Sequence, residues 1–309
     1  MNTEWTADAG ADAIGRVLVV GAGTMGRQIA LQCALYGLDV DLYDTAPDAL
    51  AAAHNEINIL AASFARHGRL SPAEATAAAA RVAPTSDLPA AAARADLVSE
   101  SVPEDPALKG RVFAQLNELC PPHTVFTTNS STLLPSMFAA ATGRPARFAA
   151  LHFHLPPWDA NVVDIMAHSD TAPAVVELLV AFARRIGQIP IVTQRESSGY
   201  VFNAMLSALN GAALKLAAEG IADVTDIDRA WMGIMKTPIG PFGIMDMIGL
   251  ETIWTITDFW ANALGDRGLR ANADFVRGYL DRGRHGRKNG HGFYDYPHPA
   301  FAADDFLEG

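Results

Sequence analysis

The stretch that most limits the folds open to this chain begins at Val17 and reads VLVVGAGTMGRQIALQCALYGLDVDLYD. Its four opening apolar residues predict a buried parallel strand, and apolar residues at helical spacing follow from Thr24. Residues 40–43 predict a second strand, which ends at Asp44. A strand, a glycine-patterned turn, a helix and a second strand in this order predict the first βαβ unit of a doubly wound parallel sheet.

Three glycines in the turn, Gly21, Gly23 and Gly26, have the spacing G-x-G-x-x-G. The first permits a tight turn, the second lets a phosphate group approach the backbone, and the third allows helix and strand to pack closely. Backbone amides at the start of the helix, where Thr24 and Met25 lie, then meet a pyrophosphate. Glycines also occur in ordinary turns, but the flanking strand and helix favour a dinucleotide-binding turn here.

Asp44 indicates which dinucleotide is bound. It lies 23 residues after Gly21, close to the spacing of the acid that bonds the ribose hydroxyls in dinucleotide-binding units. A carboxylate repels a 2′-phosphate, and residues 45–47 include no arginine that would receive one. NAD rather than NADP is therefore the expected cofactor.

The length and composition fit two folded domains, because a chain of 309 residues with 50% hydrophobic content can bury two cores. It has 23 basic and 34 acidic residues, a formal net charge of −11, and no dense basic run, which argues against a nucleic-acid partner. Residues 1–16 contain no apolar segment of the kind found in a signal peptide, and no later apolar run approaches membrane-spanning length. We therefore expect a cytoplasmic protein with no membrane contact. Cys33 and Cys120 are expected to be small buried side chains, consistent with a reducing compartment.

The order of the predicted elements divides the chain near residue 195. Residues 1–195 are expected to form an NAD-binding Rossmann-type domain, with a helical excursion near residues 46–83. From Ser197 the pattern is helical throughout, so residues 196–309 are expected to form an all-helical substrate and dimerisation domain. Further strands of the first domain are expected within residues 94–102, 124–131, 147–154 and 189–193.

Two polar clusters follow predicted strands, and open α/β sheets place their ligands at such strand ends. In DLVSESVPEDPALK, Glu100 ends a strand, while Glu104 and Lys109 lie around the next helix start. Taken alone, this first cluster favours a solvated helix cap. The second cluster, TTNSSTL, suits either a helix cap or the binding of a substrate oxygen. Its short polar side chains are those of Asn129, Ser130, Ser131 and Thr132.

The segment LHFHLPPWDANVVDIMAH carries the candidate acid–base group. His152 ends a predicted strand, and Asp164 lies 12 residues later in the next apolar segment. A carboxylate behind an imidazole fixes its tautomer and supports its protonated form, although a buried structural histidine is the more common case. His154 is expected in a loop because prolines follow it. No third ligand is expected close to the two histidines, so no metal site is predicted.

Together these motifs resemble those of the L-3-hydroxyacyl-CoA dehydrogenases, and the likeness runs from Arg16 to Tyr296. It includes the family's cofactor strand and turn (VLVVGAGTMG), its Asp-Leu-Val-x-Glu segment (DLVSESVPED), its Asn-x-Ser-Ser turn (TTNSSTL) and its Leu-His-Phe-x-x-Pro segment (LHFHLP). Three later segments, SGYVFNAML, TPIGPFGIMDMIGL and KNGHGFYDY, are similar to family segments in the same order. This set is far more specific than the glycine turn alone.

The resemblance implies an NAD-dependent oxidoreductase of fatty acid metabolism that interconverts a 3-hydroxyacyl-CoA, expected to be short-chain, and the 3-oxoacyl-CoA. It implies that His152 takes the hydroxyl proton while hydride leaves the same carbon. Asp164 stands where the family has glutamate, and Ser131 and Asn203 would bond the substrate oxygen.

The same resemblance bears on cofactor contacts and assembly. Glu104 and Lys109 fall where the family has cofactor-contacting residues, and Asn129 is expected at the cofactor as well. The helical half mediates dimerisation in this family, and the corresponding segments here are apolar on more than one face. We therefore expect a homodimer.

Three departures from the family pattern bear on the substrate. Asp164 is one methylene shorter than glutamate, and residues 153–156 read Phe-His-Leu-Pro where the family usually has Phe-Asn-Pro. The helical excursion, where the family meets the coenzyme A nucleotide, has only a thin basic group, Arg66, His67 and Arg69.

These departures leave two alternatives to a hydroxyacyl-CoA dehydrogenase. The first is a dehydrogenase of a free or carrier-bound 3-hydroxy acid, similar to the gulonate and carnitine dehydrogenases. The second is an inactive NAD-binding homologue. Retention of His152, Ser131 and Asn203 argues against the second alternative.

Overall fold

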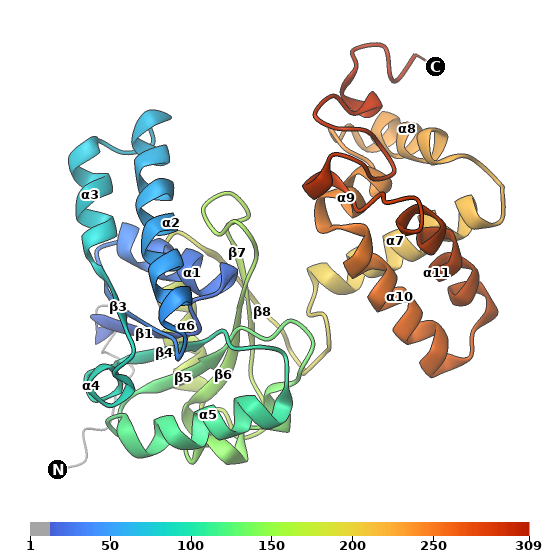
Figure 1. Ribbon diagram of the computed structural model, residues 1–309. Coiled ribbons are helices and arrows are strands. Elements are labelled where there is room, and N and C mark those ends of the chain that lie inside the picture. The colour runs from blue at the N-terminus through green and yellow to red at the C-terminus, as the bar shows by residue number, and fades with distance from the viewer. Residues whose placement is uncertain (1–12, 309) are drawn as a thin grey trace. The chain divides into compact units, whose positions relative to one another are not determined.

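The computed structural model describes residues 13–308. The chain divides into two compact units between Val201 and Phe202, slightly beyond the expected division near residue 195 (Figure 1). The first unit contains the sheet, and the second is mostly helical. Cys33 and Cys120 are free and buried, which confirms the prediction for both.

The first unit is built on an eight-stranded sheet in the order β3–β2–β1–β4–β5–β6–β7–β8. The first six strands pair in parallel, and their order is that of dinucleotide-binding sheets. Strand β7 runs antiparallel to β6 and parallel to β8. The strands are β1 (Arg16–Val20), β2 (Asp39–Tyr43), β3 (Val82–Thr85), β4 (Leu97–Glu100), β5 (Val125–Thr128), β6 (Phe148–Phe153), β7 (Val162–Met166) and β8 (Ile189–Val192).

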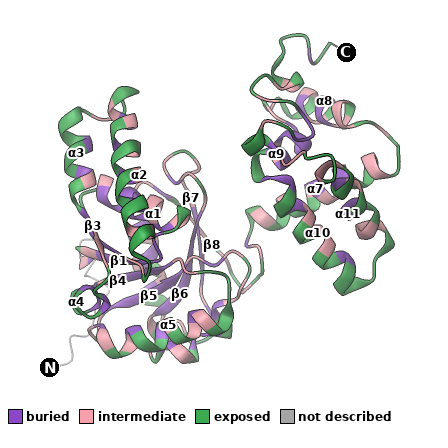
Figure 2. Cartoon of the chain, viewed as in Figure 1, coloured by how far each residue is buried: buried purple, intermediate pink, exposed green. Residues whose placement is uncertain are grey.

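Helices cover both faces of this sheet because its central strands are apolar on both sides. In β1, Val17 and Val19 join a core with α1, α2 and α6, whereas Leu18 and Val20 join a second core with α4 and α5. Figure 2 shows the resulting buried strands between more exposed helices. The helices of this unit are α1 (Thr24–Leu35), α2 (Pro47–Arg66), α3 (Pro72–Ala80), α4 (Leu88–Ala92), α5 (Pro106–Leu119) and α6 (Pro173–Arg185).

The helical excursion consists of α2 and α3, and it is shorter than predicted. Ser71 caps α3 through a capping box with Glu74. The helix ends at Ala80, and Val82 begins the edge strand β3, which pairs with β2 from Val40. The alanine-rich run has high helix propensity, so it conceals the change from helix to strand.

The second unit packs its helices around an apolar core that includes Phe242, Met245 and Phe293. After α11 the chain forms short turns and isolated bridges, so the expectation of helix throughout is wrong for this last segment. The helices are α7 (Phe202–Ala218), α8 (Val224–Met235), α9 (Pro241–Ile248), α10 (Leu250–Leu264) and α11 (Arg267–Leu280). The Rossmann-type sheet followed by a helical domain confirms the predicted fold class. None of the helices within residues 13–308 has the length and apolar character needed to cross a membrane.

Two buried carboxylates organise the helical unit. Asp228 in α8 accepts hydrogen bonds from the backbone amides of Phe242 and Gly243 at the start of α9. Asp246 in α9 accepts from the amides of Phe293 and Tyr294 in the C-terminal segment. The segments TPIGPFGIMDMIGL and KNGHGFYDY therefore hold the fold of this unit together.

Candidate active site

The glycine turn has the geometry that a bound pyrophosphate requires. Gly21 has a φ of +107°, which favours glycine, and a Cβ on Gly26 would lie 1.8 Å from the carbonyl oxygen of Gly21. A Cβ on Gly23 would meet no atom of the described residues within 4 Å. Gly23 is also the N-cap of α1 and provides no side chain to cap the helix, so the first amides of α1 face an open approach. These residues fit a dinucleotide phosphate.

Asp44 lies beside this turn, directly after β2. Its Oδ2 accepts a hydrogen bond from the amide of Ala22 at 2.8 Å, and its Oδ1 accepts from the amide of Ala46 at 2.9 Å. The carboxylate is only partly buried. The backbone therefore fixes an anionic group next to the glycine turn.

A buried ion pair lies at the end of β4. Lys109 Nζ is 2.7 Å from Glu100 Oε1, and Lys109 also donates to the carbonyl oxygen of Val102 at 3.1 Å. Burial raises the pKa of Glu100, and the Lys109 ammonium counteracts that effect. The pattern taken alone favoured a solvated helix cap, and this interpretation is wrong for Lys109, whose side chain is only 1% exposed. The helix α5 is capped by Asp105.

Glu104 connects this ion pair to the polar turn after β5. Its carboxylate is 3.4 Å from Lys109 Nζ and accepts hydrogen bonds from the Ser130 hydroxyl and from the amide and hydroxyl of Thr132. Burial acts to raise the pKa of Glu104, but the bond from Ser130 and the charge of Lys109 outweigh it, so the pKa is lowered. Two motifs far apart in the sequence thus form one charged network.

Asn129 and Ser131 lie in the same turn. Asn129 Oδ1 accepts from the amide of Phe153 at 2.8 Å, which connects the end of β5 to the end of β6. Ser131 is half-buried, and its carbonyl oxygen accepts from the amide of Gly199. The hydroxyl of Ser131 makes no hydrogen bond with the residues that the structure describes.

The register of β6 and β7 brings His152 and Asp164 together. The two residues are paired across the antiparallel strands, and His152 Nδ1 lies 3.1 Å from Asp164 Oδ2. Both side chains are buried, with 6% exposure for His152 and 1% for Asp164. The pairing that spacing alone left open is therefore present in the fold.

A second histidine contacts the same carboxylate oxygen. His154 directly follows β6, as its predicted loop position suggests, and its Nε2 lies 3.0 Å from Asp164 Oδ2. Burial alone would raise the pKa of Asp164, but hydrogen bonds from His152 and His154 outweigh it and hold the pKa below its usual value. The carboxylate is thus ionised between two imidazoles.

Tyr200 is a site residue that the sequence analysis did not single out. Its ring stacks on the His152 imidazole with 4.7 Å between ring centroids and an interplanar angle of 7°. Its hydroxyl donates to the carbonyl oxygen of Ser130 at 2.7 Å. The available signal was its place in SGYVFNAML, one of the segments that resemble the family. Tyr200 therefore connects the imidazole to the serine turn.

Both halves of the chain match models of one protein family. Residues 16–197 match the NAD-binding domain of 3-hydroxyacyl-CoA dehydrogenase, and residues 199–296 match its C-terminal domain. The chain belongs to the 3-hydroxyacyl-CoA dehydrogenase family. It is therefore an oxidoreductase that uses NAD, as predicted.

Individual relatives of this dehydrogenase cover nearly its whole length. A probable 3-hydroxybutyryl-CoA dehydrogenase of Bacillus subtilis is 32% identical over 283 residues, which is 92% of this chain and 98% of the relative. A solved structure described as a diketoreductase with dual catalysis of dicarbonyl compounds has 39% identity and a TM-score of 0.85, with 92% and 99% coverage. FadB2 of M. tuberculosis has 30% identity and a TM-score of 0.84, with the same coverage.

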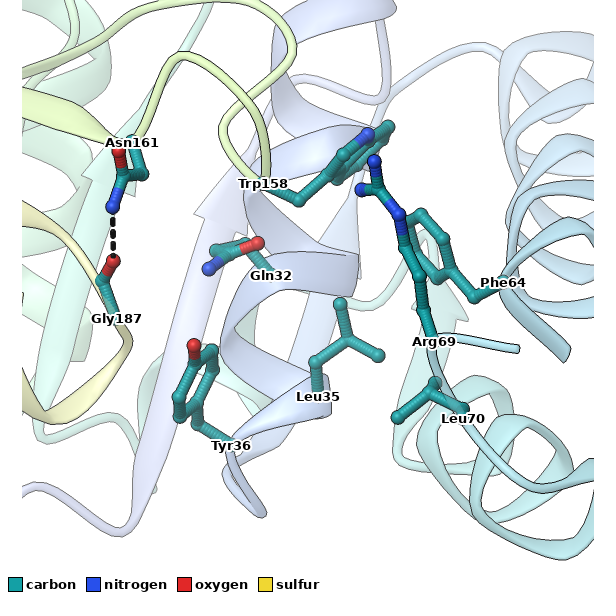
Figure 3. A pocket seen from close by; sticks show the side chains of 9 residues that line it. All are labelled: Gln32, Leu35, Tyr36, Phe64, Arg69, Leu70, Trp158, Asn161 and Gly187. Atoms are coloured by element: carbon teal, nitrogen blue, oxygen red, sulfur yellow. Dashed lines mark hydrogen bonds between the residues drawn. The ribbon is translucent and has the colours of Figure 1, made fainter. Parts of the chain in front are cut away.

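The dehydrogenase also has a hollow of about 380 Å³ beside the loop that follows His154 (Figure 3). Trp158 and Arg69 line it, with Phe64 of α2 behind them. Trp158 packs edge-on against Phe64 at 5.0 Å, and Arg69 pairs with Asp159 at 2.8 Å. These contacts hold the loop after the histidines against the helical excursion.

Most of the predicted site residues of the dehydrogenase therefore lie at the carboxyl ends of β1, β2, β4, β5 and β6. Asp164 lies within β7 and Lys109 within α5, whereas Asn203 lies in the first turn of α7 in the helical unit. Thr24, Met25 and Gly26 form the first turn of α1, next to Gly23.

Proposed function

We propose that this dehydrogenase oxidises the 3-hydroxyl group of a short-chain 3-hydroxyacyl-CoA reversibly, with His152 as the acid–base group. The observation that carries the proposal is the buried His152–Asp164 pair at the strand ends beside the serine turn. Open α/β sheets bind their ligands at this edge.

In this proposal His152 takes the hydroxyl proton through Nε2, because its Nδ1 faces Asp164. Asp164 fixes the tautomer and stabilises the imidazolium that forms when the proton is taken. Tyr200 restricts rotation of the imidazole by stacking on it. The Ser131 hydroxyl and the Asn203 amide would bond the substrate oxygen, as the family resemblance implies.

The glycine turn, the first amides of α1 and Asp44 would hold NAD, which supplies the hydride acceptor when bound. Glu104 and Asn129 would complete the cofactor side of the site. Lys109 is buried between two carboxylates, so we assign it an indirect role: it holds Glu100 and Glu104 in place.

A second candidate substrate is a 3-hydroxy or 3-oxo acid without coenzyme A. Arg69 is one of the few basic groups on the helical excursion, and its guanidinium is already paired with Asp159. This pairing leaves less positive charge for a nucleotide phosphate. The 39% identity to a diketoreductase supports the same alternative.

A substrate panel separates these candidates. NADH formation or consumption would be followed with 3-hydroxybutyryl-CoA, longer 3-hydroxyacyl-CoA thioesters, free 3-hydroxybutyrate, L-gulonate, carnitine and a diketo ester. The proposal expects the highest kcat/KM for the short thioester. A higher kcat/KM for any substrate without coenzyme A would favour the second candidate, and no turnover of any member would contradict both.

We also propose that the dehydrogenase is a cytoplasmic homodimer that associates through its helical unit. Helix α10 supports this, because Ile256, Phe259, Trp260 and Leu264 lie at helical spacing and are 46%, 61%, 47% and 65% exposed. A stripe of large apolar side chains of this kind marks an interaction surface. Fractionation of the native source would test the cytoplasmic location.

A further inference from the structure

Three metal-ligating side chains meet at the junction of β6 and β7. His152, His154 and Asp164 each offer one ligand atom, and these atoms all lie within 4.8 Å of one another. No other trio of His, Cys, Asp or Glu side chains in residues 13–308 meets this condition. The sequence suggested only the two histidines, because the third ligand lies 12 residues from His152 and reaches it through strand pairing.

The backbone presents these three side chains together. His152 and His154 are two residues apart at the end of a strand, a spacing that points side chains to the same face of a sheet. Asp164 is directly opposite His152 on the neighbouring strand. Figure 1 shows these two strands side by side in the sheet. The ligand set is therefore built mainly on strands rather than on one mobile loop.

The Asp164 carboxylate uses its two oxygens unequally. Both histidines contact Oδ2, whereas the buried Oδ1 has no hydrogen-bond partner among the described residues. An unsatisfied buried acceptor is costly. A cation bound through Oδ1, or through both oxygens, would remove this cost. The unpartnered Oδ1 is an observation independent of the spacing of the ligands.

Two imidazole nitrogens and one carboxylate oxygen form a donor set that suits Zn²⁺ and related divalent transition metals. Three protein ligands also leave a fourth tetrahedral position for water. Metal–ligand distances of about 2.0–2.2 Å place tetrahedral ligand atoms about 3.3–3.6 Å apart. The two contacts with Asp164, at 3.1 and 3.0 Å, must therefore open slightly, and the two imidazole nitrogens must lie at that spacing on either side of the ion. We propose that His152, His154 and Asp164 bind one Zn²⁺ ion reversibly and that the bound ion stops turnover.

The effect on turnover follows from the tautomer of His152 and rests on the proposed function. Zn²⁺ needs the lone pair of Nδ1, so the single proton of the neutral ring must then lie on Nε2. An imidazole in that state has no lone pair at Nε2 with which to take the hydroxyl proton. The same ion also uses the negative charge of Asp164. Zinc is therefore an inhibitor of this enzyme rather than its cofactor.

The test uses the full-length chain without an affinity tag, after dialysis against EDTA and then against chelator-free buffer. Isothermal titration with zinc chloride should show one strong site per chain, and cobalt chloride should give visible absorption bands at the same stoichiometry. His154→Gln should weaken zinc binding by at least about tenfold, since it removes a ligand. His123→Gln is the matched control, because His123 pairs with Asp96 at 3.2 Å outside any such trio. It should bind zinc as the wild type does.

Activity is measured as the rate in zinc relative to each variant's own rate without zinc. Wild type and His123→Gln should lose turnover at micromolar zinc and regain it with EDTA, whereas His154→Gln should need at least about tenfold more zinc. Retained NADH binding shows that each variant is folded.

Two results would overturn the inference in different ways. Absence of zinc binding in an active wild type, or equal zinc binding by His154→Gln, would refute the metal site and leave the proposed function standing. Zinc binding that depends on His154 but leaves turnover unchanged would refute the inhibition, and it would also contradict the role of His152 as proton acceptor.

Discussion

At the scale of single residues, the His152–Asp164 pair is the feature on which turnover should depend. His152→Gln should lower kcat by about 10²–10⁴, the usual contribution of a positioned acid–base group, while NAD affinity stays nearly unchanged. Asp164→Asn should also slow turnover, because an amide lacks the charge that stabilises the imidazolium. NADH formation on the preferred substrate measures both effects.

Asp164→Glu is the sharper comparison for the same pair. The shorter acid already reaches His152 Nδ1 at 3.1 Å, so a longer side chain must crowd the buried site and activity should fall. Near-native rates in both His152→Gln and Asp164→Asn would end the assignment of the pair as acid–base machinery.

Asp44 should set the preference for NAD over NADP. Asp44→Ala removes the charge-assisted bonds to the ribose hydroxyls, each of which is worth about 1.5–3 kcal/mol, so NAD binding should weaken by at least about tenfold. The affinity for NADP should fall less, because the repulsion of its 2′-phosphate is also lost. Asp48→Ala, at an exposed acid in the first turn of α2, is the control. An unchanged ratio of NAD to NADP affinity in Asp44→Ala would refute this role.

At the scale of elements, Asp228 joins α8 to α9 through its hydrogen bonds, and its burial makes the stability of the helical unit depend on pH. Burial raises the pKa of Asp228 to about 6, although the amides of Phe242 and Gly243 lower it in part. The folded state therefore binds a proton more tightly than the unfolded state, so this residue stabilises the fold most at low pH. Its contribution falls as pH rises from about 4 to about 6.

Asp228→Asn removes this proton linkage and tests it. The free energy of unfolding of wild type minus that of the variant should decrease between pH 4 and pH 7, by at most about 3 kcal/mol. Urea unfolding at several pH values, followed by circular dichroism, measures the difference. Parallel profiles for the two proteins would show that Asp228 does not titrate as described.

The elements near the glycine turn were predictable because local signals agree there. An apolar strand, a patterned turn and an acid-terminated strand occur in unbroken order from Val17 to Asp44. The burial of Lys109 was not predictable, because a lysine near a helix start is normally solvated and only the fold brings Glu100 and Glu104 around it. The same reason hid the contact of His154 with Asp164, which depends on strand register.

At the scale of the whole molecule, the exposed stripe on α10 predicts self-association. Light scattering at micromolar concentration should give twice the chain mass of 32.8 kDa. Phe259→Glu should shift the protein toward the monomer, because a buried unpaired charge is costly in an apolar interface. Ile59→Glu is the control, at a residue of α2 that is 52% exposed. A wild-type protein that stays monomeric would remove the homodimer from the proposal.

The hydrogen bonds that Asp246 accepts from the C-terminal segment have a consequence for folding during synthesis on the ribosome. Asp246 is buried, and its oxygens are satisfied by the amides of Phe293 and Tyr294 and by the hydroxyl of Tyr296. A nascent chain that has reached only α11 lacks all three donors, so closing the core of the helical unit would leave a buried carboxylate without these partners. We therefore expect this unit to remain open during translation and to close only when its last turns have emerged.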